Sequence, residues 1–221
     1  MSDKSFKERL AYFLEEVKNE EGYTLDDKTR YLAILAVLMG AGGYKTFSDL
    51  LDKTLKDELS VVEVKELIYQ AHDYLGIARA EAFLDIANKV ITAKGLKDDT
   101  ETMVTTIEDR LKEGVKAQVS IFGEGMKDAY KASVVNRYLA ANCFGDYYTR
   151  KGLDLRQREM ITFCFLLAQG GVEPQLISHA RGNIAVGNDK EFLMSVIIQC
   201  LPYIGYPRSL NAISALEKAT V

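Results

Sequence analysis

Proline, cysteine and histidine are all scarce in this chain of 221 residues. With only three prolines, most of the sequence can be helical, because proline interrupts a helix. The three cysteines are widely spaced and form no Cys-x-x-Cys pair, which disfavours both a disulfide framework and a zinc site. Two histidines are too few for a metal centre built from several imidazoles. We therefore expect no bound metal.

The chain also lacks an excess of basic residues and any long apolar run. Its net charge of -4 and isoelectric point of about 5.4 provide no positive field for phosphate groups, which disfavours nucleic-acid binding. The longest apolar stretch, near Met160–Ala168, is far shorter than a membrane span. The N-terminal residues are charged throughout, unlike a signal peptide or a membrane anchor. We expect a cytoplasmic protein that binds neither nucleic acid nor membrane.

The sequence contains an internal repeat, in which the same pattern of residues occurs twice. Such self-similarity indicates a repeat architecture. Five pairs of identical residues lie 128 positions apart: Leu25 with Leu153, Asp26 with Asp154, Arg30 with Arg158, Gly42 with Gly170, and Gly43 with Gly171. Four more lie 129 positions apart: Gln70 with Gln199, Tyr74 with Tyr203, Gly76 with Gly205, and Arg79 with Arg208. A unit of roughly 70 residues would struggle to bury a core alone, so we expect the two copies to pack together.

Apolar residues recur at helical spacing, and no alternating strand pattern occurs, so the predicted fold is all-α. It consists of two tandem helical repeats, residues 1–95 and, with linker helices, 96–221. Ser60 and Glu63 form a capping-box pattern at one predicted helix start. In the linker we expect a long helix over 102–121, another over 126–143, and a short connection from Phe144 to Gly152. Further helices are predicted over 4–20, 25–40, 45–57, 78–93, 154–168, 174–186, 189–200 and 207–218.

The segment that follows Gly170-Gly171 carries the residues best suited to chemistry. Helical spacing places Val172, Gln175 and His179 on one face, with Glu173 at the helix start beside them. Histidine is the side chain best suited to proton transfer near neutral pH, and a nearby carboxylate can orient its ring.

A simpler interpretation of these residues remains open. A lone histidine on a helix is often a packed or surface residue, and a glutamate in a first turn is favoured by the helix dipole. The first copy has Lys45 in place of Glu173 and Leu51 in place of His179. That difference favours a functional role in the second copy, since a structural residue has less reason to differ.

Three stretches of the second copy resemble a known family. They are FGDYYTRKGLDLRQREMITF, GGVEPQLISHARGNIAVGN and IIQCLPYIGYPRSLNAI. Over about 140–218, and weakly over 25–90, the chain resembles the carboxymuconolactone decarboxylase family of the alkyl hydroperoxidase D-like superfamily. The resemblance implies an all-helical fold with a degenerate first copy. It also implies a homo-oligomer, a trimer of tandem chains that mimics a hexamer.

The superfamily has two chemical branches. Thiol peroxidase members carry Cys-x-x-Cys with a histidine four residues later, whereas Val172 and Gln175 occupy those positions here. A dithiol cycle needs an attacking and a resolving sulfur, so the peroxidase is the weaker alternative. The decarboxylase branch keeps a glutamate and a histidine like Glu173 and His179. A third alternative is an oligomer that binds small molecules without catalysis.

The resemblance thus implies a cofactor-free decarboxylase of a small carboxylated lactone or related acid. No cofactor is expected, because the conjugated lactone carbonyl of such a substrate accepts the electrons. His179 would donate the proton and Glu173 would orient it. Arg181 or Arg208 would pair with substrate carboxylates, since a guanidinium binds them in bidentate fashion.

Other candidate residues have structural interpretations of equal or greater weight. Arg158 is repeated at Arg30, which favours a structural ion pair over substrate binding. Tyr147 could line the substrate pocket, although it and Tyr148 could equally be packing or interface aromatics. The three cysteines lie in apolar helical segments, and we expect them to fill gaps in the core. A single-thiol redox role for Cys200 is a minor alternative.

Overall fold

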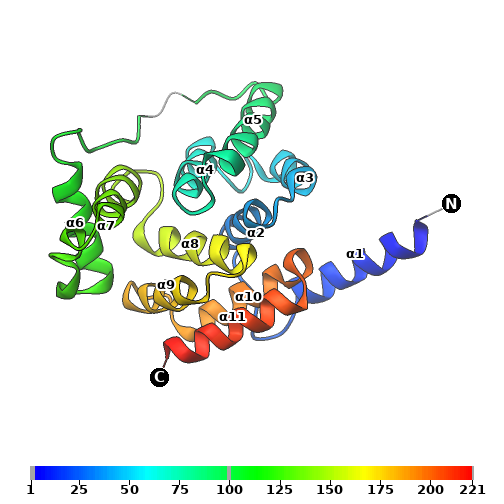
Figure 1. Cartoon of the computed structure of the whole chain (residues 1–221). Coiled ribbons are helices and arrows are strands. Elements are labelled where there is room, and N and C mark those ends of the chain that lie inside the picture. Colours follow the sequence, from blue (N-terminus) through cyan, green and yellow to red (C-terminus); the bar gives the residue numbers. More distant parts are fainter. Residues whose placement is uncertain (1–2, 99–100, 221) are drawn as a thin grey trace.

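The structure, a computed structural model, describes residues 3–98 and 101–220. Within these residues the chain is helical without any strand, which confirms the all-α prediction (Figure 1). The first half contains α1 (Lys4–Lys18), α2 (Asp27–Ala41), α3 (Tyr44–Thr54), α4 (Val61–Leu75) and α5 (Ile77–Ala93). The second contains α6 (Arg110–Phe122), α7 (Val134–Tyr138), η3 (Leu139–Tyr148), α8 (Leu155–Gln169), α9 (Glu173–Ala185), α10 (Lys190–Ile204) and α11 (Tyr206–Ala219).

Local sequence sets the starts and ends of these helices. At the start of α4, the Ser60 side chain accepts from the Glu63 N–H and the Glu63 side chain accepts from the Ser60 N–H, which confirms the predicted capping box. Asp154 and Gln157 form the same arrangement at the start of α8. Gly76 ends α4 at a positive φ of 75°, a conformation that glycine adopts without steric cost.

Two central helices, α2 and α8, lie side by side between α3–α5 and α9–α11 (Figure 1). Every residue from Leu32 to Gly40 and from Arg158 to Ala168 is buried, as expected for two helices at the centre of the molecule. The helices touch at Gly40, where an added Cβ would lie 2.8 Å from the Ala168 Cβ. One continuous core therefore combines both halves of the chain.

The helix order α2–α3–α4–α5 recurs as α8–α9–α10–α11. An arginine on each central helix also hydrogen-bonds to a glutamine in the other half of the chain. Arg158 Nη1 donates to Gln70 Oε1 at 2.9 Å, and Arg30 Nε donates to Gln199 Oε1 at 2.7 Å. The four residues are the same ones that match between the copies of the sequence pattern. The tandem repeat itself stays a prediction that these contacts support.

The linker differs from the sequence prediction. The expected helix over 102–121 begins only at Arg110, because the preceding segment is held in an irregular conformation by buried threonines. Thr102 Oγ1 donates to Glu66 Oε1 at 2.6 Å, and Thr105 Oγ1 donates to the Gly145 carbonyl at 2.9 Å. These bonds attach the segment to other elements and replace helical hydrogen bonds.

The second correction concerns residues 126–148. Short 3-10 turns at Glu124–Met126 and Ala129–Lys131 precede α7, which begins at Val134 and continues directly into η3. The predicted connection that starts at Phe144 is therefore mostly helical. Gly114 and Gly145 let α6 and η3 pack closely, since an added Cβ at either position would collide with the backbone of the other helix.

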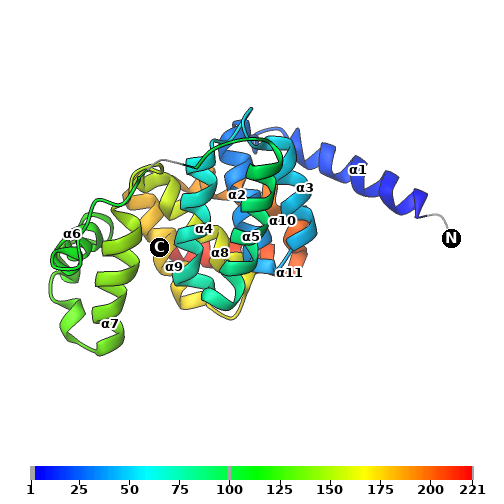
Figure 2. The same ribbon diagram turned by 90° about the horizontal axis from the view of Figure 1, so that it is seen from above.

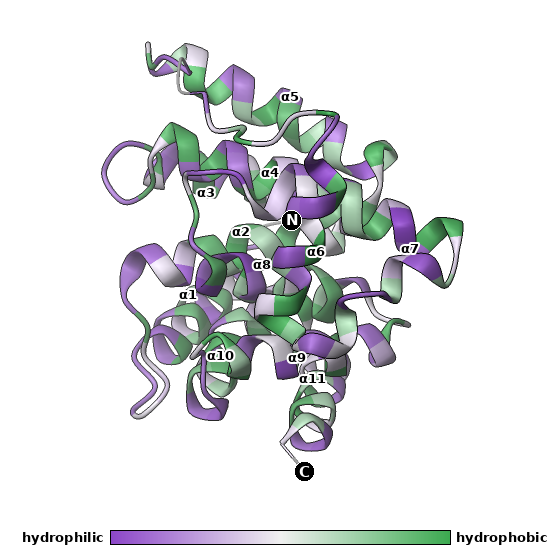
Figure 3. Cartoon of the chain, turned by 90° about the vertical axis from the view of Figure 1, so that its left-hand side faces the viewer, coloured by the Kyte–Doolittle hydropathy of each residue, from purple (hydrophilic) through white to green (hydrophobic). Residues whose placement is uncertain are grey.

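The helices at the periphery carry both hydrophilic and hydrophobic residues. Hydrophilic and hydrophobic residues alternate along α5 and α7 (Figure 3). The N-terminal helix α1 packs on α10 and extends away from the rest of the molecule (Figure 2). In the part of the chain that the structure describes, no helix combines the length and apolar character needed to cross a membrane.

Candidate functional site

A buried histidine–carboxylate pair joins α9 to α8. His179 Nδ1 lies 2.9 Å from Glu159 Oε2; the glutamate side chain is fully buried and the histidine side chain is 11% exposed. When Glu159 is ionised its oxygens can only accept, and Nδ1 then carries the donated proton. A neutral His179 then presents Nε2 as a bare lone pair, and a protonated His179 presents Nε2–H.

The other oxygen of Glu159 is satisfied by hydroxyl groups. Tyr148, in η3, donates to Glu159 Oε1 at 2.8 Å. The Tyr148 hydroxyl also lies 2.8 Å from Thr162 Oγ1, which in turn accepts from Gln70 Nε2 at 2.8 Å. A buried carboxylate is costly unless it is hydrogen-bonded, and this network supplies the bonds.

Aromatic rings enclose the imidazole of His179. The rings of Tyr74, from α4, and Phe122, from the end of α6, both meet it edge-on with centroids 5.5 Å away. The Tyr74 hydroxyl lies 3.1 Å from the Tyr148 hydroxyl and accepts from the Cys143 thiol at 3.5 Å. Aromatic rings therefore flank the imidazole on two sides, and a hydrogen-bonded polar network holds its carboxylate partner.

The backbone near His179 is shaped to bring α8 and α9 together. An added Cβ at Gly182 would lie 2.5 Å from Glu159 Oε2 and 2.8 Å from Phe122 Cε1. Asn183 Nδ2 donates to the carbonyls of Glu159, at 2.9 Å, and His179, at 2.7 Å. A glycine and a buried asparagine thus fix the relative position of the histidine and the glutamate.

Burial controls the ionisation of the neighbouring groups. It raises the pKa of Tyr74, Tyr148 and Cys143 well above their ordinary values, so all three stay protonated near neutral pH. Burial, followed by the charge of Asp146, raises the pKa of Asp73 to about 8. Asp73 adjoins Cys143 at the far end of the network from His179.

The carboxylate bonded to His179 is Glu159, not the predicted Glu173. Glu173 is exposed in the first turn of α9. Six residues along a helix correspond to about 600°, so Glu173 and His179 point roughly 120° apart. The prediction that Glu173 orients the ring is therefore corrected.

A signal for Glu159 was present in the sequence. It is an isolated acid beside the apolar run Met160–Ala168, directly after the matched Arg158, where the first copy has Tyr31. Spacing around His179 does not indicate this partner, because Glu159 lies 20 positions earlier and on another helix.

The predicted substrate-binding residues lie apart from this pair. Arg181 is exposed, and its Nη2 donates to the Lys218 carbonyl at 3.2 Å. Arg208 is half-buried beside Gly170. Among the described residues, no hydrogen bond or ion pair joins either arginine to His179. Their role toward a substrate stays a prediction.

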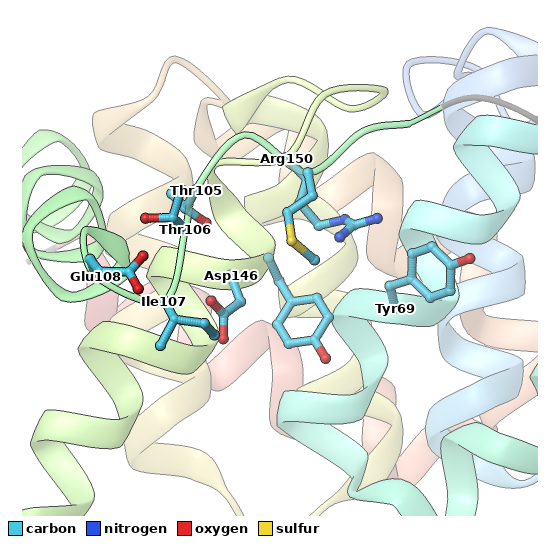
Figure 4. Close-up of a pocket in the computed structure, with 9 residues that line it drawn as sticks. Tyr69, Thr105, Thr106, Ile107, Glu108, Asp146 and Arg150 are labelled. Atoms are coloured by element: carbon cyan, nitrogen blue, oxygen red, sulfur yellow. The ribbon is translucent and has the colours of Figure 1, made fainter.

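Tyr147 lines a separate pocket of about 580 Å³ between α4, the segment before α6, and η3. Figure 4 shows Tyr69, Asp146 and Arg150 around it. His179 does not line this pocket. The two neighbouring tyrosines therefore have different surroundings: Tyr147 lines this pocket, and Tyr148 donates to the Glu159 carboxylate that contacts His179.

Arg158 and the cysteines have structural surroundings. Arg158 is fully buried and pairs with Glu66 at 2.9 Å, which confirms the interpretation as a structural ion pair. All three cysteines are buried and free. Burial raises the pKa of the Cys164 thiol, as it does for Cys143, which disfavours the reactive thiolate.

Two comparisons with known proteins found similarities. Residues 134–218 match the sequence model of the Carboxymuconolactone decarboxylase family. The 4-carboxymuconolactone decarboxylase of Acinetobacter baylyi (strain ATCC 33305 / BD413 / ADP1) is 26% identical over 117 residues, which cover 50% of this chain and 87% of that protein. Tyr148, Glu159 and His179 lie inside the matched segment; Tyr74 and Phe122 lie outside it.

Proposed function

We propose that the chain, whose residues 134–218 match the carboxymuconolactone decarboxylase family, is a cofactor-free carboxy-lyase of a small carboxylated lactone or related acid. The observation that carries this proposal is the pair formed by His179 and Glu159 at 2.9 Å. It provides one histidine of defined orientation, with one nitrogen bound to a buried carboxylate, and we propose that the other nitrogen faces the substrate.

The proposed reaction needs only a proton donor and a site that favours the transition state. The carbon–carbon bond to the carboxylate breaks, CO₂ leaves, and the electron pair moves into the conjugated carbonyl to form an enolate. Protonated His179 then delivers its Nε2 proton to carbon, and the electron pair returns from the enolate oxygen. Glu159 stabilises the imidazolium before transfer, because opposite charges attract strongly in a buried site.

The thiol peroxidase alternative has less support. Val172 and Gln175 stand where its two sulfurs are required, and Cys143 and Cys164 are buried thiols with raised pKa values. A peroxidase would need an accessible thiolate.

We further propose that the chain assembles as a homotrimer. Three large apolar side chains within the five residues of α7, Val134, Val135 and Tyr138, are exposed, and a contiguous exposed apolar cluster of this kind supports an interface on that helix. Native mass spectrometry of the purified chain tests this, and a monomer at micromolar concentration would overturn it.

The lyase is tested by measuring CO₂ release from 4-carboxymuconolactone by the wild-type chain and by His179→Ala. Loss of the proton donor should lower kcat about 10²- to 10⁴-fold while the helical circular dichroism spectrum stays unchanged. His72→Gln, at the other histidine, is the matched control and should keep activity. Full activity in His179→Ala, or none in the wild type with any carboxylated lactone tried, would overturn the proposal.

A further inference from the structure

Tyr74 belongs to the first half of the chain, outside the segment that matches the family, yet it contacts the site in two ways. Its ring lies edge-on to the His179 imidazole, at 5.5 Å between centroids. Its hydroxyl lies 3.1 Å from that of Tyr148, which holds Glu159. It therefore contacts the histidine directly and the glutamate through one intermediate.

The direction of every hydrogen bond in the network follows from the carboxylate at its end. Tyr148 has one proton and gives it to Glu159, so its oxygen can only accept from its other neighbours. Thr162 accepts from Gln70 and thus donates to Tyr148. The remaining lone pair of Tyr148 can be filled by the Tyr74 hydroxyl.

Tyr74 is therefore a donor to Tyr148 and an acceptor for Cys143, whose thiol donates to it at 3.5 Å. The Cys143 thiol thus donates to the Tyr74 hydroxyl, Tyr74 donates to Tyr148, and Tyr148 donates to Glu159. With these bonds in place the Tyr148 oxygen has no free lone pair, and its O–H is directed at Glu159.

We propose that Tyr74 is a positioning residue supplied by the first half of the chain, which fixes Tyr148 and Glu159 so that His179 keeps its proton on Nδ1 and presents Nε2. The tautomer of a histidine is set by the hydrogen bond that its other nitrogen makes. Without the Tyr74 hydroxyl, Tyr148 loses one of its two donors and gains freedom to turn away from Glu159. The catalytic consequence, unlike the tautomer, rests on the proposed lyase function.

The chain contains a second tyrosine, at the corresponding position of the sequence repeat, that does not contact a histidine–carboxylate pair. Tyr203 corresponds to Tyr74 in the sequence repeat but lies near Arg30 and Cys200. In the first copy, Tyr31 and Leu51 stand where the second has Glu159 and His179. Tyr203→Phe is therefore a control that removes the same hydroxyl from an equivalent helix position without touching a histidine–carboxylate pair.

The test is the ¹⁵N NMR spectrum of the imidazole nitrogens in the uniformly labelled full chain, at a pH where the ring is neutral. His72→Gln assigns the two histidines. We expect His179 to be the Nδ1–H tautomer in the wild type and in Tyr203→Phe. Tyr74→Phe should raise the Nε2–H fraction, and Tyr148→Phe, which removes the direct bond to Glu159, should raise it more.

Wild-type tautomer populations in a folded Tyr74→Phe variant would overturn the proposal. If that variant does not fold, Tyr74→Met fills similar volume without a hydroxyl and is judged by the same criterion.

A second readout is turnover of the carboxylated lactone. The loss of one hydrogen bond of positioning should lower kcat about three- to tenfold in Tyr74→Phe, with KM within twofold of the wild type. A change in KM alone would overturn the positioning role. If the wild type shows no turnover while the tautomer shift occurs, the proposed function fails and the positioning role stands.

Discussion

Glu66 and Arg158 form an ion pair in which neither side chain has any exposed surface, with Nη2 2.9 Å from Oε2. The pair joins α4 of the first half to α8 of the second. Arg150 Nε binds the other oxygen of Glu66 at 2.9 Å, so one carboxylate serves two guanidinium groups. The surplus positive charge is stabilised by carbonyl groups, since Arg158 Nη2 also donates to the Arg150 carbonyl at 2.8 Å.

Glu66→Gln should lower the free energy of unfolding by about 3–5 kcal/mol, because it leaves a buried guanidinium without its counter-charge. Urea unfolding measures the loss. Lys45→Ala, which removes an exposed pair with Asp49, should cost less than about 1 kcal/mol. Equal effects for the two variants would contradict the role given to burial.

The raised pKa of Asp73 predicts that the stability of the fold depends on pH. Its pKa is raised to about 8 in the folded protein by burial, so folding favours the protonated form. The folded state then binds more protons than the unfolded state between about pH 4 and pH 8, and stability falls as pH rises through that window by up to about 1.4 kcal/mol per pH unit. Above the folded pKa the contribution is constant.

Asp73→Asn should flatten this profile, with the larger gain in stability at pH 8 than at pH 5. The groups that face Asp73 include Asp146, Arg110 and Cys143, and His72 Nδ1 lies 3.6 Å from its Oδ1. His72→Gln in the same series separates histidine titration from that of Asp73. If the slope of stability against pH were unchanged in Asp73→Asn, the assignment of this pH dependence to Asp73 would be wrong.

Gly182 tests how closely α9 must approach α8. Alanine would favour the helix by about 1 kcal/mol, but its Cβ would meet Glu159 Oε2 at 2.5 Å and Phe122 at 2.8 Å. Overpacking a fixed site costs about 1–3 kcal/mol, so we expect Gly182→Ala to be destabilising overall and to lower activity. Gly125→Ala should leave both stability and activity unchanged, because no atom lies within 4 Å of the added Cβ.

Sequence periodicity predicted most helices to within a few residues, because apolar spacing and capping patterns such as that of Ser60 and Glu63 are local. It failed between 102 and 148, where Thr102, Thr105 and the close contact of Gly114 with η3 fix the backbone through distant partners. His179 was found because it stands out in its own helix. Glu159 was missed because its pairing depends on how two helices pack, which spacing along one helix does not reveal.

The final prediction separates the two candidate carboxylates. Glu159→Gln removes the charge beside His179 Nδ1 and should lower kcat about ten- to a hundredfold, the effect of losing a charge-assisted hydrogen bond of about 1.5–3 kcal/mol. Glu173→Gln alters an exposed residue in the first turn of α9 and should leave kcat within twofold of the wild type. Both are measured by CO₂ release from the same lactone at the same pH, with circular dichroism to check folding. If Glu173→Gln were the more damaging variant, the proton transfer would depend on a carboxylate other than the one hydrogen-bonded to His179, and the site would have to be rebuilt around the start of α9.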